Sequence, residues 1–174
     1  NQPSVARRHF YGLREAKRDL VGIAIFDRLD QQLQSPPELV EVSWSRREIE
    51  NYFCTRDVLL SWAQRYGQEQ GAGPLFVEQW IHTMEESIAQ VEQAMQVLGK
   101  GSPWSNDTKV TDDFLNPLFR EFFKRLDLPN LFQKTDYHVL ASLVPSDSID
   151  QEISAVLDEL TKVSSRAKPS ERAE

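Results

Sequence analysis

The chain has 174 residues, a net charge of −7 and a sequence pI of about 5.1, a size that suits one domain or one small domain with an extension. The acidic balance argues against a surface that coats nucleic acid by general phosphate neutralisation, because that requires a basic face. Cys54 is the only cysteine, so no disulfide can form within the chain, which fits the reducing cytoplasm. No apolar run approaches the roughly 20 residues that span a bilayer, and no basic-then-apolar leader is present, so we expect neither a membrane partner nor secretion.

The first third of the sequence predicts an α/β arrangement. Ser4 is placed to cap a helix over residues 5–17. The apolar run of residues 20–26 is continuous rather than alternating, which predicts a strand buried on both faces. A loop rich in Gln, Ser and Pro leads to a second predicted strand at residues 39–44. This order favours a mainly parallel sheet.

From about Arg46 onward, the apolar residues recur at helical spacing. The longest predicted helix covers residues 77–98 and ends at a segment containing Gly99, Gly101 and Pro103. The fold class is therefore α/β, with a partial, mainly parallel sheet in the N-terminal third followed by a predominantly helical C-terminal region. We expect residues 1–60 to form the α/β part, residues 61–163 to pack on it as helices, and residues 164–174 to be a disordered tail.

Two groups of acidic residues follow the predicted strands. Asp27 and Asp30 come directly after the first strand, and Glu48 and Glu50 come shortly after the second. Functional groups gather at the carboxyl ends of strands in open α/β sheets, and carboxylates are the ligands of hard cations such as Mg²⁺. A solvated turn would also place Asp at a strand end, and a charged helix start would also explain the two glutamates, so both alternatives remain open.

Basic residues near these acids suggest contacts with phosphate. Arg46 and Arg47 precede the two glutamates, and guanidinium groups match phosphate oxygens in pairs. Lys134 lies at a predicted helix start, where a cation is unfavourable for the helix dipole. A lysine that stabilises charge on a phosphate explains this position, and an ordinary exposed lysine is the alternative.

Four segments together resemble a known family. They are residues 12–16, 20–30 and 44–52, with residues 134–137 as a looser match. They are similar to the Toprim domain of ATP-dependent nucleases of the OLD (overcoming lysogenization defect) type. The most specific part is Arg-Glu-Ile-Glu-Asn-Tyr, residues 47–52, after an aspartate strand. The resemblance covers residues 1 to about 60, and residues 130–160 loosely.

The sequence departs from the Toprim pattern in two places. Such domains open with a strand that carries a glutamate, and no such segment precedes residue 1, so we expect the chain to be a fragment of a longer protein. The usual Asp-x-Asp pair is here Asp27-x-x-Asp30, which moves the second acid relative to the strand.

The resemblance implies a metal-dependent DNA endonuclease, acting in prokaryotic nucleic-acid processing or anti-phage defence. Asp27, Asp30 and Glu50 would hold Mg²⁺ or Mn²⁺, with Glu48 and Lys134 as catalytic residues. Whether Glu48 or Glu50 is the ligand stays open at this point. Arg46 and Arg47 would contact DNA phosphate. The partners it implies are DNA and an ATPase, in the parent chain or as a separate subunit, and a homo-oligomer is compatible with it. The chain alone is expected to have little nuclease activity.

Two other classes of function remain. One is a non-catalytic helical interaction module, in which the Toprim-like site is degenerate and the helix of residues 77–98 docks on a partner. The other is a phosphotransfer or phosphatase domain with Asp27 as the nucleophile. Such a domain would require a hydroxyl and a lysine in set places after the aspartate, which the sequence does not provide.

Overall fold

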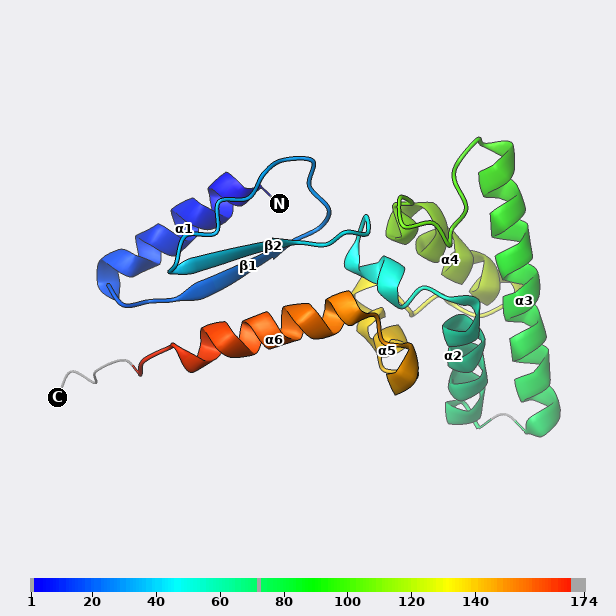
Figure 1. Ribbon diagram of the computed structural model, residues 1–174. Coiled ribbons are helices and arrows are strands. Elements are labelled where there is room, and N and C mark those ends of the chain that lie inside the picture. Colours follow the sequence, from blue (N-terminus) through cyan, green and yellow to red (C-terminus); the bar gives the residue numbers. More distant parts are fainter. Residues whose placement is uncertain (1, 72, 170–174) are drawn as a thin grey trace. The chain divides into compact units, whose positions relative to one another are not determined.

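The computed structural model describes residues 2–71 and 73–169, and Figure 1 draws its helices and strands. They are α1 (Pro3–Ala16), β1 (Gly22–Phe26), β2 (Leu39–Ser43), α2 (Arg56–Glu69), α3 (Pro74–Val97), α4 (Asn116–Arg125), α5 (His138–Ala141) and α6 (Gln151–Ser165). Short 3-10 or π-helical turns occupy Ile49–Tyr52, Thr111–Leu115, Lys134–Asp136 and Ser146–Ser148. In the described chain helix exceeds strand and α3 is the longest helix, which confirms the predicted α/β class.

The chain divides into two compact units. The first combines Asn1–Ser45 with Ile149–Glu174, and the second is Arg46–Ser148. The N-terminal segment of the first unit therefore ends at Ser45, whereas we expected the α/β part to run to residue 60, and the unit includes α6, which contacts β1. Of the expected tail, residues 164 and 165 end α6 and residues 166–169 form no helix or strand. Residues 170–174 lie outside the described chain.

The first unit is a two-stranded parallel sheet with a helix on each face (Figure 1). The register runs from Gly22 opposite Leu39 to Phe26 opposite Ser43. Phe10 of α1 approaches β1 so closely that a Cβ atom at Gly22 would lie 2.9 Å from its ring. Glycine therefore allows α1 to lie directly on the sheet, and α6 covers the other face.

Three details of the first unit correct the predictions. Strand β1 begins at Gly22 rather than residue 20, and β2 ends at Ser43. Strand β1 is not buried on both faces, since Ile25 is 37% exposed; the described sheet has only two strands, so β1 lies at its edge. Ser4 does not cap α1, because the helix begins at Pro3, and proline suits the first helical position, where an N–H would have no partner.

The second unit has an aromatic core built from α2, α3 and α4. Trp62 of α2 stacks on Tyr66 with 4.9 Å between ring centroids and meets the edge of Phe119 at 4.8 Å. The fully buried side chains of this core include Leu59, Met84, Ile88, Phe114, Leu115, Leu118, Phe119, Phe122 and Phe123. Apolar residues three and four apart on each helix supply this core, as their spacing predicts.

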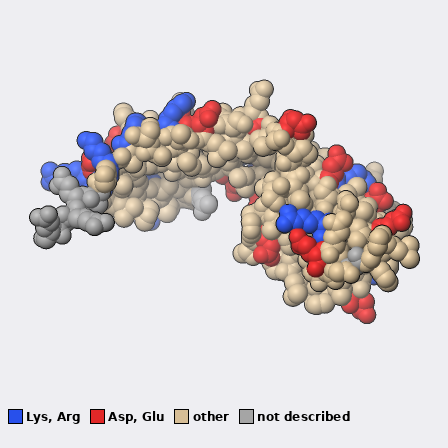
Figure 2. Space-filling view, turned by 90° about the horizontal axis from the view of Figure 1, so that it is seen from below, with Lys and Arg blue, Asp and Glu red and all other residues tan. Residues whose placement is uncertain are grey.

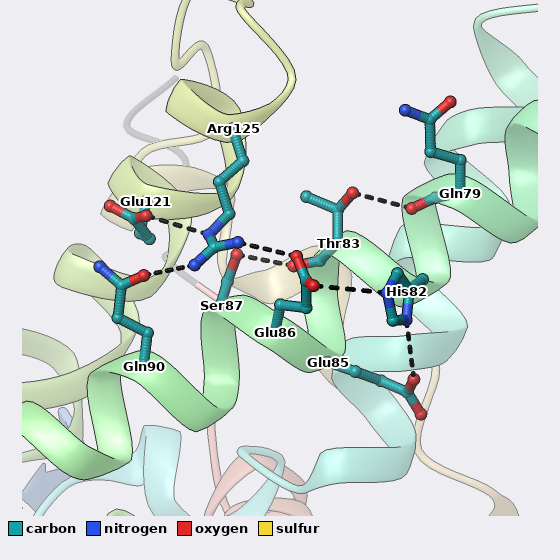
Figure 3. A network of polar contacts seen from close by, with 9 residues as sticks. All are labelled: Gln79, His82, Thr83, Glu85, Glu86, Ser87, Gln90, Glu121 and Arg125. Atoms are coloured by element: carbon teal, nitrogen blue, oxygen red, sulfur yellow. Dashed lines mark hydrogen bonds and ion pairs between the residues drawn. The ribbon is translucent and has the colours of Figure 1, made fainter.

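A surface network of polar contacts joins α4 to α3 (Figure 3). The guanidinium of Arg125 donates to Glu86 at 2.7 Å, to Glu121 at 3.0 Å, and to Gln90. His82 lies 3.4 Å from Glu86 on the next turn of α3. These groups are largely solvent-exposed, so we regard them as stabilising the surface of the helix pair and not as a binding site.

Candidate metal and phosphate site

Asp27 lies where the sequence predicts, at the carboxyl end of a parallel strand. Strand β1 ends at Phe26, and Asp27 and Asp30 follow in a loop with exposed side chains. Within the described chain, neither carboxylate has a hydrogen-bond or ion-pair partner. Four carboxylate oxygens are therefore free to bind a ligand from solvent, and strand β2 ends beside them.

Hydrogen bonds join the loop of residues 27–37 to β2 at two points. Near the acids, the Ser43 hydroxyl accepts the Leu29 N–H at 3.0 Å and donates to the Asp27 carbonyl at 3.2 Å. At the far end, the Ser35 hydroxyl donates to the Glu41 carbonyl at 2.9 Å and accepts the Glu41 N–H at 3.1 Å. No motif marks Ser43 in the sequence, although the register of two parallel strands places it beside Asp27.

Glu41 anchors the far end of the same loop. Its buried carboxylate accepts two hydrogen bonds from Arg7, at 2.5 and 2.7 Å, and one from the Gln34 N–H at 3.1 Å. The hydrogen bond from Arg7 lowers the pKa of Glu41, although burial opposes this effect. The pair therefore links α1, β2 and the loop through an ionised carboxylate.

Glu48 is buried in the second unit and serves the local fold. It is 6% exposed, and its carboxylate accepts the Thr111 N–H at 2.9 Å. It also forms a capping box with Asn51, in which each side chain accepts the other residue's backbone N–H. The predicted catalytic role of Glu48 stays a prediction, but these bonds already explain why a carboxylate stands there.

Glu50 is half-buried in the turn that Glu48 caps. Burial, followed by the charge of Glu50, raises the pKa of Cys54. Cys54 therefore stays a thiol at neutral pH, which argues against a nucleophilic role for it.

The two arginines predicted to contact phosphate are in different environments. Arg46 donates to the Asn51 carbonyl at 2.8 Å, and its guanidinium carbon lies 4.4 Å from the centroid of the Tyr52 ring. Arg47 is exposed, and its backbone N–H donates to the Asn106 carbonyl at 2.8 Å. Of the two, Arg47 has the side chain that is better placed to meet a phosphate from solvent.

Lys134 is exposed at the start of the turn Lys134–Asp136. A hydrogen bond from Lys109 is the main cause of a lowered pKa at Asp112, and the charge of Lys134 contributes to the same shift. Lys134 is therefore close enough to a carboxylate to influence it.

The predicted site residues are divided between the two units. Asp27 and Asp30 belong to the first unit, whereas Arg46, Arg47, Glu48, Glu50 and Lys134 belong to the second. Among the residues that the structure describes, no three His, Cys, Asp or Glu side chains form a group arranged to hold a metal ion. Asp27 and Asp30 are the predicted site residues at the carboxyl edge of the first unit's sheet, where the carboxylate of Glu152 in α6 also accepts the Ser45 N–H at 2.8 Å.

A scan of protein-family models, a search of curated proteins and a search of solved structures each found no match to this chain.

The surface offers no broad basic area on the face seen in Figure 2, where the described acidic and basic side chains are interspersed. Among the described helices, none has the length and apolar character needed to cross a membrane. The net charge of −7 therefore gives no long-range attraction for DNA.

Proposed function

We propose that this chain is part of a Mg²⁺- or Mn²⁺-dependent DNA endonuclease of the Toprim type, in which an ATPase or a second subunit supplies DNA affinity. The observation that supports this best is the loop after β1, where Asp27 and Asp30 expose unpartnered carboxylates at the carboxyl edge of a parallel sheet. Ligands of open α/β sheets bind at that edge. The proposed substrate is a DNA phosphodiester.

The donor set at this loop fits a hard divalent cation. Mg²⁺ is commonly bound by one or two carboxylates, with waters and substrate phosphate completing its octahedron. Asp27 and Asp30 supply two such groups within the first unit. When bound, the ion would supply positive charge for the phosphate and lower the pKa of a bound water.

The remaining residues divide between substrate contact and support of the fold. Arg47 and Lys134 have exposed cationic side chains, and their proposed role is to bind and orient phosphate oxygens. Arg46 and Glu48 hold the turn that carries Glu50, through the bonds described above. We therefore assign these two a positioning role and retain Asp27 as the principal ligand.

The outer edge of β1 has room for a further strand. Because the Phe26 carbonyl accepts the Trp44 N–H, the backbone groups of Gly22, Ala24 and Phe26 point toward β2. The N–H and C=O groups of Ile23 and Ile25 point the other way and have no partner within the described chain. We propose that the glutamate strand implied by the Toprim resemblance pairs at this edge, beside Asp27.

Calorimetric titration of the chain with MnCl₂ tests the metal site. The wild-type chain should bind Mn²⁺, and Asp27→Asn should weaken binding by about 10-fold or more. Asp19→Asn is the matched control, because Asp19 is an acid that precedes the amino end of β1 and pairs with Lys17. Equal binding by the Asp27→Asn and Asp19→Asn variants would refute the assignment.

Cleavage of plasmid DNA tests the activity itself. In a longer protein that includes the upstream glutamate strand, Asp27→Asn should abolish Mg²⁺-dependent cleavage, whereas Asp19→Asn should not. Residues 1–174 alone should cleave weakly or not at all, because two carboxylates on an exposed loop hold an ion and its water poorly. Strong cleavage by residues 1–174 would mean that the chain contains every essential group.

A second candidate function is a helical interaction module without catalysis. It is favoured by the large apolar side chains exposed at both ends of α3, where Leu75 is 77%, Phe76 58% and Val97 80% exposed. If the chain binds no Mn²⁺, this candidate replaces the nuclease. It then predicts that Phe76→Gln weakens the association of the chain with its partner protein.

A further inference from the structure

We propose that Ser43 is a positioning residue that holds the turn of Asp27 and Asp30 in the shape a divalent cation requires. This inference rests on the proposed function, because it concerns the same metal site. Ser43 does not touch the ion in this proposal. It acts through the backbone between the two acids.

The strand register places Ser43 beside the start of the loop. Ser43 is the last residue of β2 and lies opposite Phe26, the last residue of β1. Its side chain is therefore level with the point where the chain leaves β1 and enters the loop. Any group at position 43 that bonds to the loop acts at the base of the turn that carries Asp27.

The Ser43 hydroxyl makes a pair of hydrogen bonds to the backbone of the loop. It accepts the Leu29 N–H at 3.0 Å, and it donates to the Asp27 carbonyl at 3.2 Å, with the Trp44 carbonyl as an alternative acceptor at 3.4 Å. One oxygen atom thus fixes both a carbonyl and an N–H within three consecutive residues. These residues form most of the Asp27-x-x-Asp30 spacing.

The carboxylates of Asp27 and Asp30 are not held in place by contacts of their own within the described chain. Asp27 and Asp30 have exposed side chains with no polar partner in the described chain, so their separation depends on the backbone that joins them. A metal site with two protein carboxylates loses affinity when the carboxylates are not held at the required distance. The hydroxyl of Ser43 is a contact that restricts this backbone next to the acids.

The loop also provides its own control. Ser35 makes the equivalent pair of bonds to the Glu41 backbone at the far end of the loop, where there is no exposed acid of the proposed site. The backbone φ of Ser35 is 31°, and alanine tolerates that conformation no better than serine does. Ser35→Ala therefore removes a comparable hydroxyl from the same loop without loosening the turn of Asp27.

The experiment measures Mn²⁺ affinity by calorimetry, urea unfolding, and hydrogen exchange of the Leu29 amide, all on the full 174-residue chain. Ser43→Ala should weaken Mn²⁺ binding by about 10-fold and speed exchange at Leu29. Ser43→Thr, which keeps the hydroxyl, should restore both toward wild type. Ser35→Ala should lower the urea midpoint while leaving the Mn²⁺ affinity unchanged. If Ser43→Ala does not fold, Ser43→Cys is measured in its place.

The outcomes separate this inference from the proposed function. If the wild-type chain binds no Mn²⁺, the metal site is refuted and the positioning role with it. If wild type binds Mn²⁺ and Ser43→Ala binds it equally well despite faster exchange at Leu29, only the positioning role is refuted. Equal weakening by Ser43→Ala and Ser35→Ala would also refute it, since the effect would then be one of loop stability alone.

Discussion

Replacing Glu48 by alanine should destabilise the second unit strongly. The carboxylate is 6% exposed and accepts the backbone N–H groups of Thr111 and Asn51. Hydrogen bonds to charged groups contribute about 1.5–3 kcal/mol each, and a buried N–H left without an acceptor costs about 1–3 kcal/mol. We expect Glu48→Ala to lower the free energy of unfolding by about 3–5 kcal/mol, a large share of the total for a domain of this size.

The isosteric variant provides an internal check on this value. Glu48→Gln keeps one oxygen acceptor but turns an amide N–H₂ toward the second backbone donor, so its loss should be about 2 kcal/mol. Glu78→Ala is the matched control, because Glu78 is an exposed acid on α3 and its loss should stay within about 0.5 kcal/mol.

Urea unfolding followed by tryptophan fluorescence is the assay. Three of the four tryptophans, Trp62, Trp80 and Trp104, belong to the second unit, so the signal reports chiefly on the unit that contains Glu48. If Glu48→Ala unfolds at the wild-type urea midpoint, then the bond to Thr111 does not support the fold. In that case the carboxylate is available for chemistry, as the sequence alone predicts.

Three further predictions concern other contacts. Pairing with Arg7 lowers the pKa of Glu41 below its ordinary value of 4.5, so the stabilisation by this pair is fully present above pH 4.5 and is lost as the pH falls through the folded-state pKa. Urea midpoints measured from pH 7 to pH 3 should therefore fall less steeply for Glu41→Gln than for wild type. Parallel curves for the two proteins would contradict this. Trp62→Ala should cost about 3–5 kcal/mol in unfolding free energy, more than Trp104→Ala, since Trp62 is 2% and Trp104 37% exposed; equal losses would count against the aromatic core. Arg125→Ala should lower the free energy of unfolding by less than about 1 kcal/mol, because the ion pairs of Arg125 are exposed. This loss should be smaller in about 1 M NaCl, where salt screens the charges. An equal loss at high salt would contradict this.

The helices were predictable from sequence because apolar spacing on one face is a local property. Residues such as Trp62, Met84 and Phe119 fall on buried faces as their 3.6-residue period requires. The position of Asp27 was predictable for a similar reason, since a strand ends where its apolar run ends. What local pattern could not give was exposure: the run before Asp27 suggested burial on both faces, but burial depends on how many strands flank β1.

The contacts that decide the role of each acid join residues distant in sequence. Glu48 is bonded to Thr111, and Ser45 donates through its backbone to Glu152 at 2.8 Å. Neither Thr111 nor Glu152 is marked by a motif near its partner, so the sequence did not decide whether Glu48 or Glu50 is the metal ligand. The structure distinguishes them by burial and by hydrogen bonds, and it also reveals Ser43, which no pattern of charge or hydrophobicity marks.

The return of α6 to the strands of the first unit has a consequence for protein synthesis. A ribosome releases β1 and β2 long before it releases the helix that covers one face of their sheet, because all of Arg46–Ser148 is translated in between. The second unit, by contrast, is one uninterrupted stretch and can complete its core as soon as Ser148 has emerged. During translation the second unit can therefore complete its fold before the first, because β1 and β2 are not covered until α6 has emerged.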